Sequence, residues 1–143
     1  MQTADQKPDL SFPKSQKLCG DKAIGILFAK GQAFTKHPFR VVYLPLSADE
    51  LRPGEAPLRM MISVGKKRFK RAVKRNRVKR QTREAWRKSK HVVEDAIAAH
   101  PAIQGLHVAL IFCGDGLPLS ADVDRAIDKA TSKLALIINE TTL

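Results

Sequence analysis

The chain has 143 residues, of which 26 are Lys or Arg and 14 are Asp or Glu, and its net charge at pH 7 is +12. With 43% hydrophobic residues it is expected to fold as a globular domain, which excludes a largely disordered chain. No run reaches the ~18 apolar residues of a membrane span, and the stretch up to Lys17 lacks the apolar segment of a secretory signal. We therefore expect a cytoplasmic protein with Cys19 and Cys113 reduced, a single disulfide being the alternative.

A tail and a short helix are expected first. Residues 1–13 are polar and contain two prolines, so we predict a flexible N-terminal tail, followed by a single domain over residues 14–143. A helix is predicted over residues 20–31, with Asp21 capping its first turn and Gly31 ending it in a left-handed conformation. The apolar side of this helix is formed by Ile24, Leu27 and Phe28.

Three stretches after this helix have the composition of β-strands. Residues 39–46 indicate a strand that ends at Pro45 and the following loop. Residues 58–65 indicate a second strand, which we expect to pair antiparallel with the first across that loop. Residues 33–35 are expected to add a short edge strand.

Residues 66–90 concentrate the positive charge of the chain. Fourteen of them are Lys or Arg and one, Glu84, is acidic, so this segment carries +13 and the remainder of the chain about −1. At about 100° per residue, one side of a helix over this segment would be largely apolar, with Ala72, Val78, Thr82, Ala85 and Trp86. The opposite side would be polar and cationic, with Asn76, Arg77, Arg80, Arg83 and Arg87. We predict one amphipathic helix with a face for the core and a face for a partner.

The remaining residues predict a helix, a strand and a helix. Residues 91–103 continue the helical pattern, residues 106–114 form the near-continuous apolar run of a buried strand, and residues 119–140 repeat apolar side chains at helical spacing after Ser120, a good N-cap. The order helix, two or three strands, helix, strand, helix predicts an α+β two-layer sandwich. Its last strand would be reached by a crossover through the basic helix.

The basic segment favours a polyanionic partner. Solvated helices ordinarily mix charges at i,i+4 spacing, whereas fourteen cations with one acid repel one another unless a polyanion neutralises them. Nucleic acid is therefore favoured over a merely solvated surface. An anionic membrane is less favoured, because the apolar face of the helix is needed for the core.

No catalytic or metal site is predicted within the chain itself. The histidines are scattered without metal-ligand spacing, and no glycine-rich phosphate loop occurs. Asp49, Glu50 and Glu55 lie together in a Pro/Gly loop, where they are expected to aid solubility. Any chemistry is expected to reside in a partner.

The sequence around the basic segment resembles a known family. Residues 69–87, FKRAVKRNRVKRQTREAWR, contain an Arg-Asn-Arg triplet, then Val-Lys-Arg, then Arg-Glu-Ala-Trp. Upstream, the segments KSQKLCGDKAIGILFAKGQAF, FRVVYL and ISVGKKRFKRAV are similar to the family's opening helix, first long strand and strand–helix junction. Over about residues 12–90 the chain thus resembles the bacterial ribonuclease P protein component, and its later elements match that family in order more than in letters.

The resemblance implies a fold, an activity and partners. The family has an α/β sandwich of the ribosomal S5 domain 2 type, with a left-handed crossover between parallel strands through the Arg-rich helix, against the usual right-handed rule. Its members are subunits of a ribonucleoprotein endoribonuclease, whose catalytic RNA removes the 5′ leader of precursor tRNA to form the mature 5′ end. The expected partners are one catalytic RNA per protein and precursor tRNA. The expected cofactor is Mg²⁺, bound mainly through the RNA.

The resemblance also implies two sets of binding residues. The RNA-facing set is Lys66, Lys67, Arg68, Arg75, Asn76, Arg77, Lys79, Arg80 and Arg83. The family's cleft for the single-stranded leader, between the first helix and the sheet, corresponds to Ile24, Phe28, Arg40 and Val42. Some relatives carry aromatic residues where this chain has Ile24 and Val42, and core packing is the alternative for Ile24 and Phe28. The alternative function is a non-enzymatic basic RNA-binding protein, such as a ribosomal one, which would require neither the Arg-Asn-Arg context nor the cleft.

Overall fold

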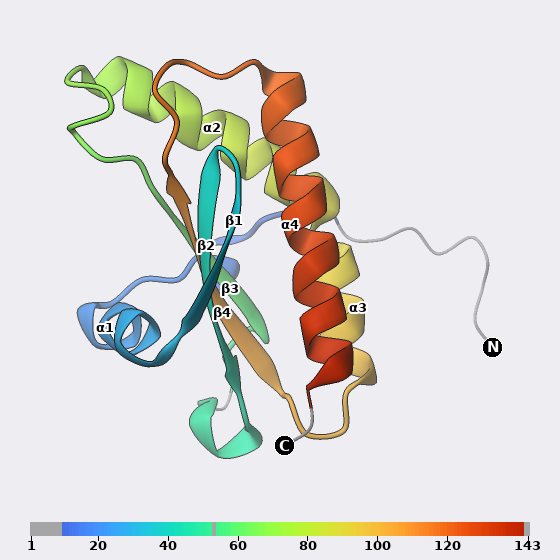
Figure 1. Ribbon diagram of the computed structural model, residues 1–143. Coiled ribbons are helices and arrows are strands. Elements are labelled where there is room, and N and C mark those ends of the chain that lie inside the picture. Colours follow the sequence, from blue (N-terminus) through green and yellow to red (C-terminus); the bar gives the residue numbers. More distant parts are fainter. Residues whose placement is uncertain (1–9, 53, 142–143) are drawn as a thin grey trace.

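The computed structural model describes residues 10–52 and 54–141 (Figure 1). Its helices are α1 (Asp21–Lys30), α2 (Ala72–Ser89), α3 (His91–Ala99) and α4 (Ser120–Glu140), with short 3-10 turns η1 (Lys14–Gln16) and η2 (Ala48–Glu50). Its strands are β1 (Gln32–Lys36), β2 (Phe39–Leu46), β3 (Leu58–Ser63) and β4 (Gly105–Phe112). The predicted α+β class is confirmed, because α2, α3 and α4 cover one face of a four-stranded sheet (Figure 1). Helix α1 lies against the other face.

The order of strands in the sheet is β1-β2-β4-β3. β2 pairs antiparallel with β1 and with β4, whereas β3 pairs parallel with β4. The predicted edge strand is therefore present as β1, but the predicted antiparallel pairing of residues 58–65 with residues 39–46 is wrong, because β4 lies between them. β4 takes the central position because its side chains are buried on both faces of the sheet, as its near-continuous apolar run indicates.

The predicted crossover through the basic helix is confirmed. β3 and β4 are parallel neighbours, and the chain between them forms α2 and α3. The left-handed sense of this crossover stays a prediction from the family resemblance. The two helices meet at Lys90, whose side chain is 1% exposed and pairs with Glu94 at 3.2 Å. This ion pair, with Lys90 buried and Glu94 half-buried, lies at the junction between the cationic helix and the rest of the crossover.

The ends of α1 differ from the prediction. Asp21 makes no capping hydrogen bond, and the helix instead begins after Gly20, whose φ of 98° lies in the region that glycine tolerates best. Gly31 ends the helix with a φ of −73°, so it is not left-handed. A glycine is still required there, because a Cβ would lie 2.4 Å from the carbonyl oxygen of Leu27 and 2.9 Å from that of Tyr43. Close approach of α1 to β2 therefore explains Gly31.

The start of α4 also differs. Ser120 is the first helical residue rather than the N-cap, which is Leu119 and offers no side-chain cap. The Ser120 hydroxyl instead accepts a hydrogen bond from Gln81 Nε2 at 3.1 Å, and the same nitrogen donates to the Pro118 carbonyl at 3.1 Å. These bonds attach the loop before α4 to α2.

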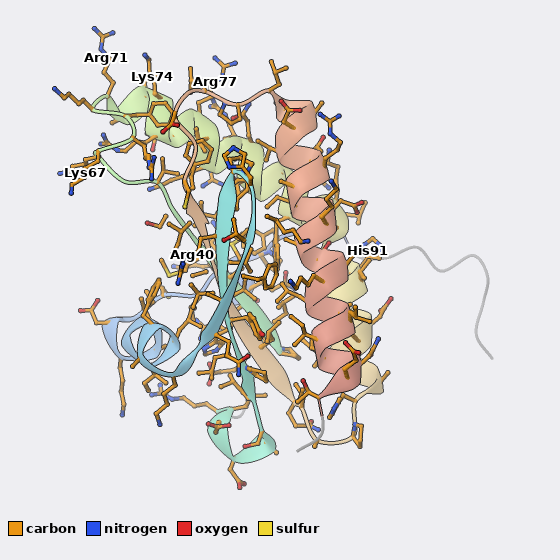
Figure 2. All side chains as sticks on the ribbon, in the orientation of Figure 1. Arg40, Lys67, Arg71, Lys74, Arg77 and His91 are labelled. Atoms are coloured by element: carbon orange, nitrogen blue, oxygen red, sulfur yellow. The ribbon has the colours of Figure 1, made fainter. Side chains whose placement is uncertain are left out.

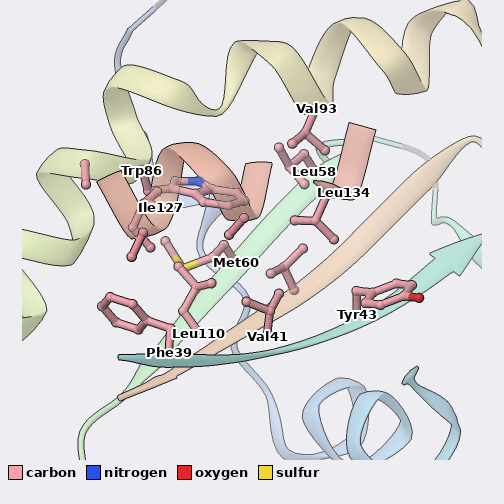
Figure 3. Close-up of a cluster of buried hydrophobic side chains, with 14 of the residues drawn as sticks. Phe39, Val41, Tyr43, Leu58, Met60, Trp86, Val93, Leu110, Ile127 and Leu134 are labelled. Carbon is pink, nitrogen blue, oxygen red and sulfur yellow. The ribbon is translucent and has the colours of Figure 1, made fainter. Parts of the chain in front are cut away.

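The main hydrophobic core lies between the sheet and helices α2, α3 and α4 (Figure 3). From α2 it receives Val78, Thr82, Ala85 and Trp86, all of which were predicted on the apolar face. Ala72 was predicted there too but is exposed, because the first turn of α2 projects beyond the sheet (Figure 1). Trp86 is 1% exposed and belongs to the same cluster as Met60, Ile127 and Leu134.

Residues 1–9 of the predicted tail lie outside the described residues. The described part of that stretch contacts the domain, since the Leu10 carbonyl accepts a hydrogen bond from Arg87 Nη1 at 3.1 Å and Phe12 packs partly buried against the core. Both cysteines are free thiols. Over the described ranges, no helix combines the length and the apolar character needed to cross a membrane.

Candidate nucleic-acid interface

The junction between β3 and α2 presents a group of exposed cations. Lys66, Lys67 and Arg68 are exposed in the turns after β3, and Arg68 makes a weakly held surface pair with Asp115 at 3.2 Å. Figure 2 shows Lys67, Arg71, Lys74 and Arg77 extending outward around the projecting end of α2. The family resemblance did not mark three of the exposed cations, which are Lys70, Arg71 and Lys74. In the sequence, only the high number of cations in residues 66–90 indicated that these three residues could contact a polyanion.

Arg75 differs from its neighbours in the Arg-Asn-Arg triplet. It is partly buried, and its Nη1 donates hydrogen bonds to the carbonyl oxygens of Phe69 and Lys70, at 2.8 Å each. Phe69 is buried and stacks on Phe112 with ring centroids 5.9 Å apart. Arg75 thereby holds the junction in its folded path, while Asn76 and Arg77 are exposed to solvent.

The outer face of α2 carries cations without counter-charges. Arg77, Arg80 and Arg83 are exposed, and no acid among the described residues forms an ion pair with any of them. The lone acid of the helix, Glu84, accepts hydrogen bonds from Arg87 at 2.5 and 3.1 Å, and this bonding lowers its pKa below the usual value. Glu84 is thus paired with Arg87, so Arg77, Arg80 and Arg83 remain available to bind phosphates.

The face of the sheet that carries α1 consists of three rows of side chains. Strand register sets one row as Arg40, Ile111 and Ser63, the next as Val42, Ala109 and Met61, and the third as Leu44, His107 and Arg59. Helix α1 covers the middle row, because Leu27 packs in one buried cluster with Val42 and Ala109. The first row lies on the side of α1 that is nearer α2; its Arg40 is exposed, and Ile111 and Ser63 are half-buried. We call this row the strip beside α1.

The four predicted cleft residues fall into two pairs around this contact. Val42 is 6% exposed and Ile24 is partly buried, and both pack in the cluster beneath α1. Phe28 is 46% exposed and Arg40 is exposed, so these two are accessible to a ligand. Figure 2 shows Arg40 extending from β2 on the side that carries α1. Ile24 and Val42 are therefore packing residues beneath α1, whereas Phe28 and Arg40 lie on the accessible surface.

A groove connects the sheet face with the cationic helix. It has a volume of about 380 Å³ and runs along β3, with Phe12, Lys17, Met61, Lys79 and Arg83 among its lining residues. Lys79 and Arg83 come from α2, whereas Met61 belongs to the middle row of the sheet face that carries α1. The cations of α2 and the α1 side of the sheet are therefore neighbouring parts of one surface.

Metal-binding side chains do not gather on this surface. Within residues 10–52 and 54–141 no group of three His, Cys, Asp or Glu side chains could hold a metal ion. The donor groups of these described residues thus form no cluster that fits a resident Mg²⁺ ion.

Comparison with known proteins decides the family. The family model of ribonuclease P matches residues 12–107, which include α1, the basic helix and most of the sheet. The chain belongs to the ribonuclease P protein family. It is 38% identical over 128 residues to the ribonuclease P protein component of Porphyromonas gingivalis strain W83, with 90% of this chain and 89% of the relative covered. The component from Chlorobaculum tepidum is 33% identical over 93 residues, covering 65% of this chain and 60% of the relative.

Solved structures show the same fold. The RNase P protein of Staphylococcus aureus superposes with a TM-score of 0.60 at 20% identity, covering 88% of this chain and 100% of that one. The RNase P protein from Thermotoga maritima gives a TM-score of 0.52 at 22% identity, covering 89% and 98%. Together with the family assignment, these findings make the chain a subunit of ribonuclease P, a ribonucleoprotein nuclease with an RNA partner, rather than a ribosomal protein.

Proposed function

We propose that the junction and the outer face of α2 bind the catalytic RNA of ribonuclease P. The observation that carries this is the set of exposed arginines, Arg77, Arg80 and Arg83, which have no acidic partner among the described residues. Phosphate contacts would come from Lys66, Lys67, Arg68, Asn76, Arg77, Lys79, Arg80 and Arg83. Arg75 would act by holding the junction that presents them, since its Nη1 is bonded to backbone carbonyls.

The second part of the proposal is that the strip beside α1 holds the 5′ leader of precursor tRNA. Phe28 offers an exposed aromatic ring on which a base can stack, and Arg40 offers a cation for the leader phosphates. Ile24 and Val42 pack in the cluster beneath α1, so they would support the helix rather than stack on leader bases. Only precursor tRNA has a leader, so this contact would favour substrate over product.

The third part concerns the chemistry. Phosphodiester hydrolysis requires groups that bind metal and orient a water molecule. The described residues offer no such cluster, so the endonucleolytic step would be carried by the RNA, with Mg²⁺ held mainly by RNA phosphates. The protein, one copy per RNA in the cytoplasm, would neutralise phosphate charge and lower the Mg²⁺ concentration that the particle needs.

A reconstitution tests this proposal. The purified chain and its cognate RNA are assayed on precursor tRNA at low and high Mg²⁺, with leaders from none to about eight nucleotides, a length within the range that one single-strand groove covers. We expect no cleavage by the protein alone, cleavage by the RNA alone at high Mg²⁺, and a lower Mg²⁺ requirement in the particle. Affinity should rise with leader length. Cleavage without RNA would overturn the assignment of the chemistry, and affinity independent of the leader would overturn the cleft.

A further inference from the structure

A second cavity lies on the other flank of α1. At about 100° per residue, Ile26 points roughly opposite to Ile24 and Phe28, and it lines a cavity of about 580 Å³. This volume is within the range of roughly 300–1,000 Å³ that small-ligand sites have. The cavity is bounded by the start of α1, by Leu46 at the end of β2, and by the third row of the sheet face, which is Leu44, His107 and Arg59.

The floor of this cavity contains two buried polar atoms without partners. His107 is 8% exposed, and its Nε2 has no hydrogen-bond partner among the described residues. The same holds for Nε of Arg59, its neighbour on β3. Arg59 is held in position by its other nitrogens, since Nη1 donates to Glu55 at 2.9 Å and Nη2 donates to the Lys17 carbonyl at 3.1 Å. Buried polar atoms are normally paired, so these two indicate a ligand with polar atoms on one edge.

The protonation of His107 suits such a ligand. Burial lowers the pKa of His107 below its usual value, the nearby Arg59 lowers it further, and Glu55 opposes the shift. The ring is therefore neutral at pH 7, with one nitrogen that donates and one that accepts. Beside it, Arg59 Nε is a donor. Such a set of donors and acceptors matches the edge of a nucleobase.

The walls and the rim complete the site. The walls are apolar at Ile26, Leu44 and Leu46, which suits the flat faces of a base. The rim carries Lys22, Lys30 and Arg52, and none of these cations forms an ion pair with a described residue. Of the acids in the lining, Glu50 accepts hydrogen bonds from the backbone and hydroxyl of Ser47, and Glu55 accepts them from the Arg52 backbone and Arg59. Both carboxylates remain ionised, since their pKa values are lowered. With Asp21 the lining therefore has three acids against four cations, which are Lys22, Lys30, Arg52 and Arg59, and Glu55 is paired with Arg59. The cavity keeps a small excess of positive charge.

We propose that this cavity binds one nucleotide, with its base between Ile26 and the leucines, its polar edge on His107 and Arg59, and its phosphate on the rim cations. Two sources share this chemistry. One is a free mononucleotide, and the other is a nucleotide of single-stranded RNA that continues past the leader strip. The second source rests on the leader path proposed above, whereas the first does not.

The first experiment uses free nucleotides and the full chain. Cys19 is exposed and lines the cavity, whereas Cys113 lies after β4 and does not line it, so the two thiols provide a signal and an internal control. Cys19 also lines the groove along β3, and the Ile26 variant described below distinguishes binding in the cavity from binding in that groove. We expect AMP, GMP, CMP or UMP to slow alkylation of Cys19 in a saturable way and to leave Cys113 unchanged. Adenosine should protect less well than AMP, because it lacks the phosphate that the rim cations would bind.

Variants on the two flanks of α1 sharpen this test. Ile26→Trp fills the cavity from a side chain that is 39% exposed, so it should weaken nucleotide binding by at least about tenfold without unfolding the chain. His107→Phe should do the same where its thermal melt shows a folded protein. Phe28→Ala, on the opposite flank, should leave mononucleotide binding unchanged. Protection of Cys19 that persists in Ile26→Trp would contradict the proposal.

The second experiment distinguishes the sources in the assembled particle. If RNA supplies the nucleotide, Ile26→Trp should lower affinity for precursor tRNA with long leaders and leave short leaders unaffected, whereas Phe28→Ala should affect both. If a free nucleotide is the ligand, Ile26→Trp should leave all leaders unaffected while abolishing protection of Cys19. If Phe28→Ala leaves affinity for precursor tRNA unchanged, that result contradicts the proposed leader site beside α1 but not the proposed nucleotide site in the cavity. Absence of both nucleotide protection and a long-leader effect would overturn the proposal.

Discussion

The two faces of the sheet differ in what their side chains do, although the same strands supply both. On the face under α2, α3 and α4, Phe39 and Val41 of β2 are fully buried. On the α1 face, Arg40 of the same strand is exposed, and the third row holds His107 and Arg59 with unpaired atoms. Alternation along a strand thus separates residues that stabilise the domain from residues available to ligands. Changes on one face should therefore leave the other largely intact.

The largest effect is expected on the closed face. Trp86→Ala removes a side chain that is 1% exposed, and it should lower the free energy of unfolding by about 3–5 kcal/mol through lost burial and a residual cavity. Thermal or denaturant melts measure this. Val73→Ala, at a site on α2 that is 78% exposed, is the matched control and should change little. If Trp86→Ala melts at the same temperature as wild type, Trp86 is not buried in the core on the closed face of the sheet.

A smaller effect, of a different kind, is expected at Phe28. Phe28→Ala should lower the affinity of the particle for precursor tRNA by about 1–3 kcal/mol if a leader base stacks on the ring, and should not affect mature tRNA. The melting temperature should change little, because the ring is 46% exposed. Equal losses for precursor and mature tRNA would show that Phe28 acts through the fold rather than through the leader.

The cationic face should respond to salt. Arg77→Ala and Arg80→Ala should each make the dependence of log K on log salt shallower by about 0.7–0.9, which corresponds to about a five- to tenfold weaker binding to the catalytic RNA at 0.1 M salt. Both should melt like wild type, since both side chains are exposed. Arg125→Ala is the control, because Arg125 lies on α4 and pairs with Asp122. Equal salt slopes in wild type and the three variants would rule out phosphate contacts by Arg77 and Arg80.

The smallest effect is expected from His107. Because its pKa is lowered below the usual 6.5, the unfolded chain binds more protons than the folded one below that pH, so stability falls as the pH drops. Between pH 7.5 and 5.5 we expect a decrease in melting temperature of about 1–2 °C that is absent in His107→Leu. Glu50 and Glu55 act in a lower range, since their lowered pKa values cost stability only below about pH 4.5. His37→Gln, at an exposed position, should behave like wild type.

Much of the fold followed from periodicity, and the errors have physical causes. The apolar face of α2 was predicted because Val78, Thr82, Ala85 and Trp86 recur at helical spacing. The antiparallel pairing of β3 with β2 was predicted wrongly, because local sequence favours pairing across a short loop, whereas in the fold β4 lies between these two strands. Gly31 and Ser120 were assigned to helix ends, yet their roles come from contacts with β2 and α2 that only the folded chain brings together.

The cationic surface could be predicted better than the sheet face. A dense charge run is visible in the sequence, and helical spacing already divides it into inner and outer sides. Arg75 bonds to the carbonyl of Phe69, and this role depends on the backbone path of the preceding turn, which the sequence alone does not specify. The cavity behind α1 was missed, although a histidine within the apolar run of β4 and an arginine within β3 were available as signals. Their adjacency depends on the residue-by-residue register of β3 against β4, which was not predicted.

The central place of β4 has a consequence for how the chain is made. Residues 105–112 join β2 to β3, yet they leave the ribosome after both of those strands and after the basic helix. Until they emerge, the hairpin of β1 and β2 can form locally, while β3 has no strand beside it and Trp86 has no complete surface to pack on. During synthesis there is therefore an interval in which the cationic helix has left the ribosome but the complete sheet on which it packs has not yet formed. In this interval the helix is close to ribosomal RNA. Closure of the domain waits for its last strand.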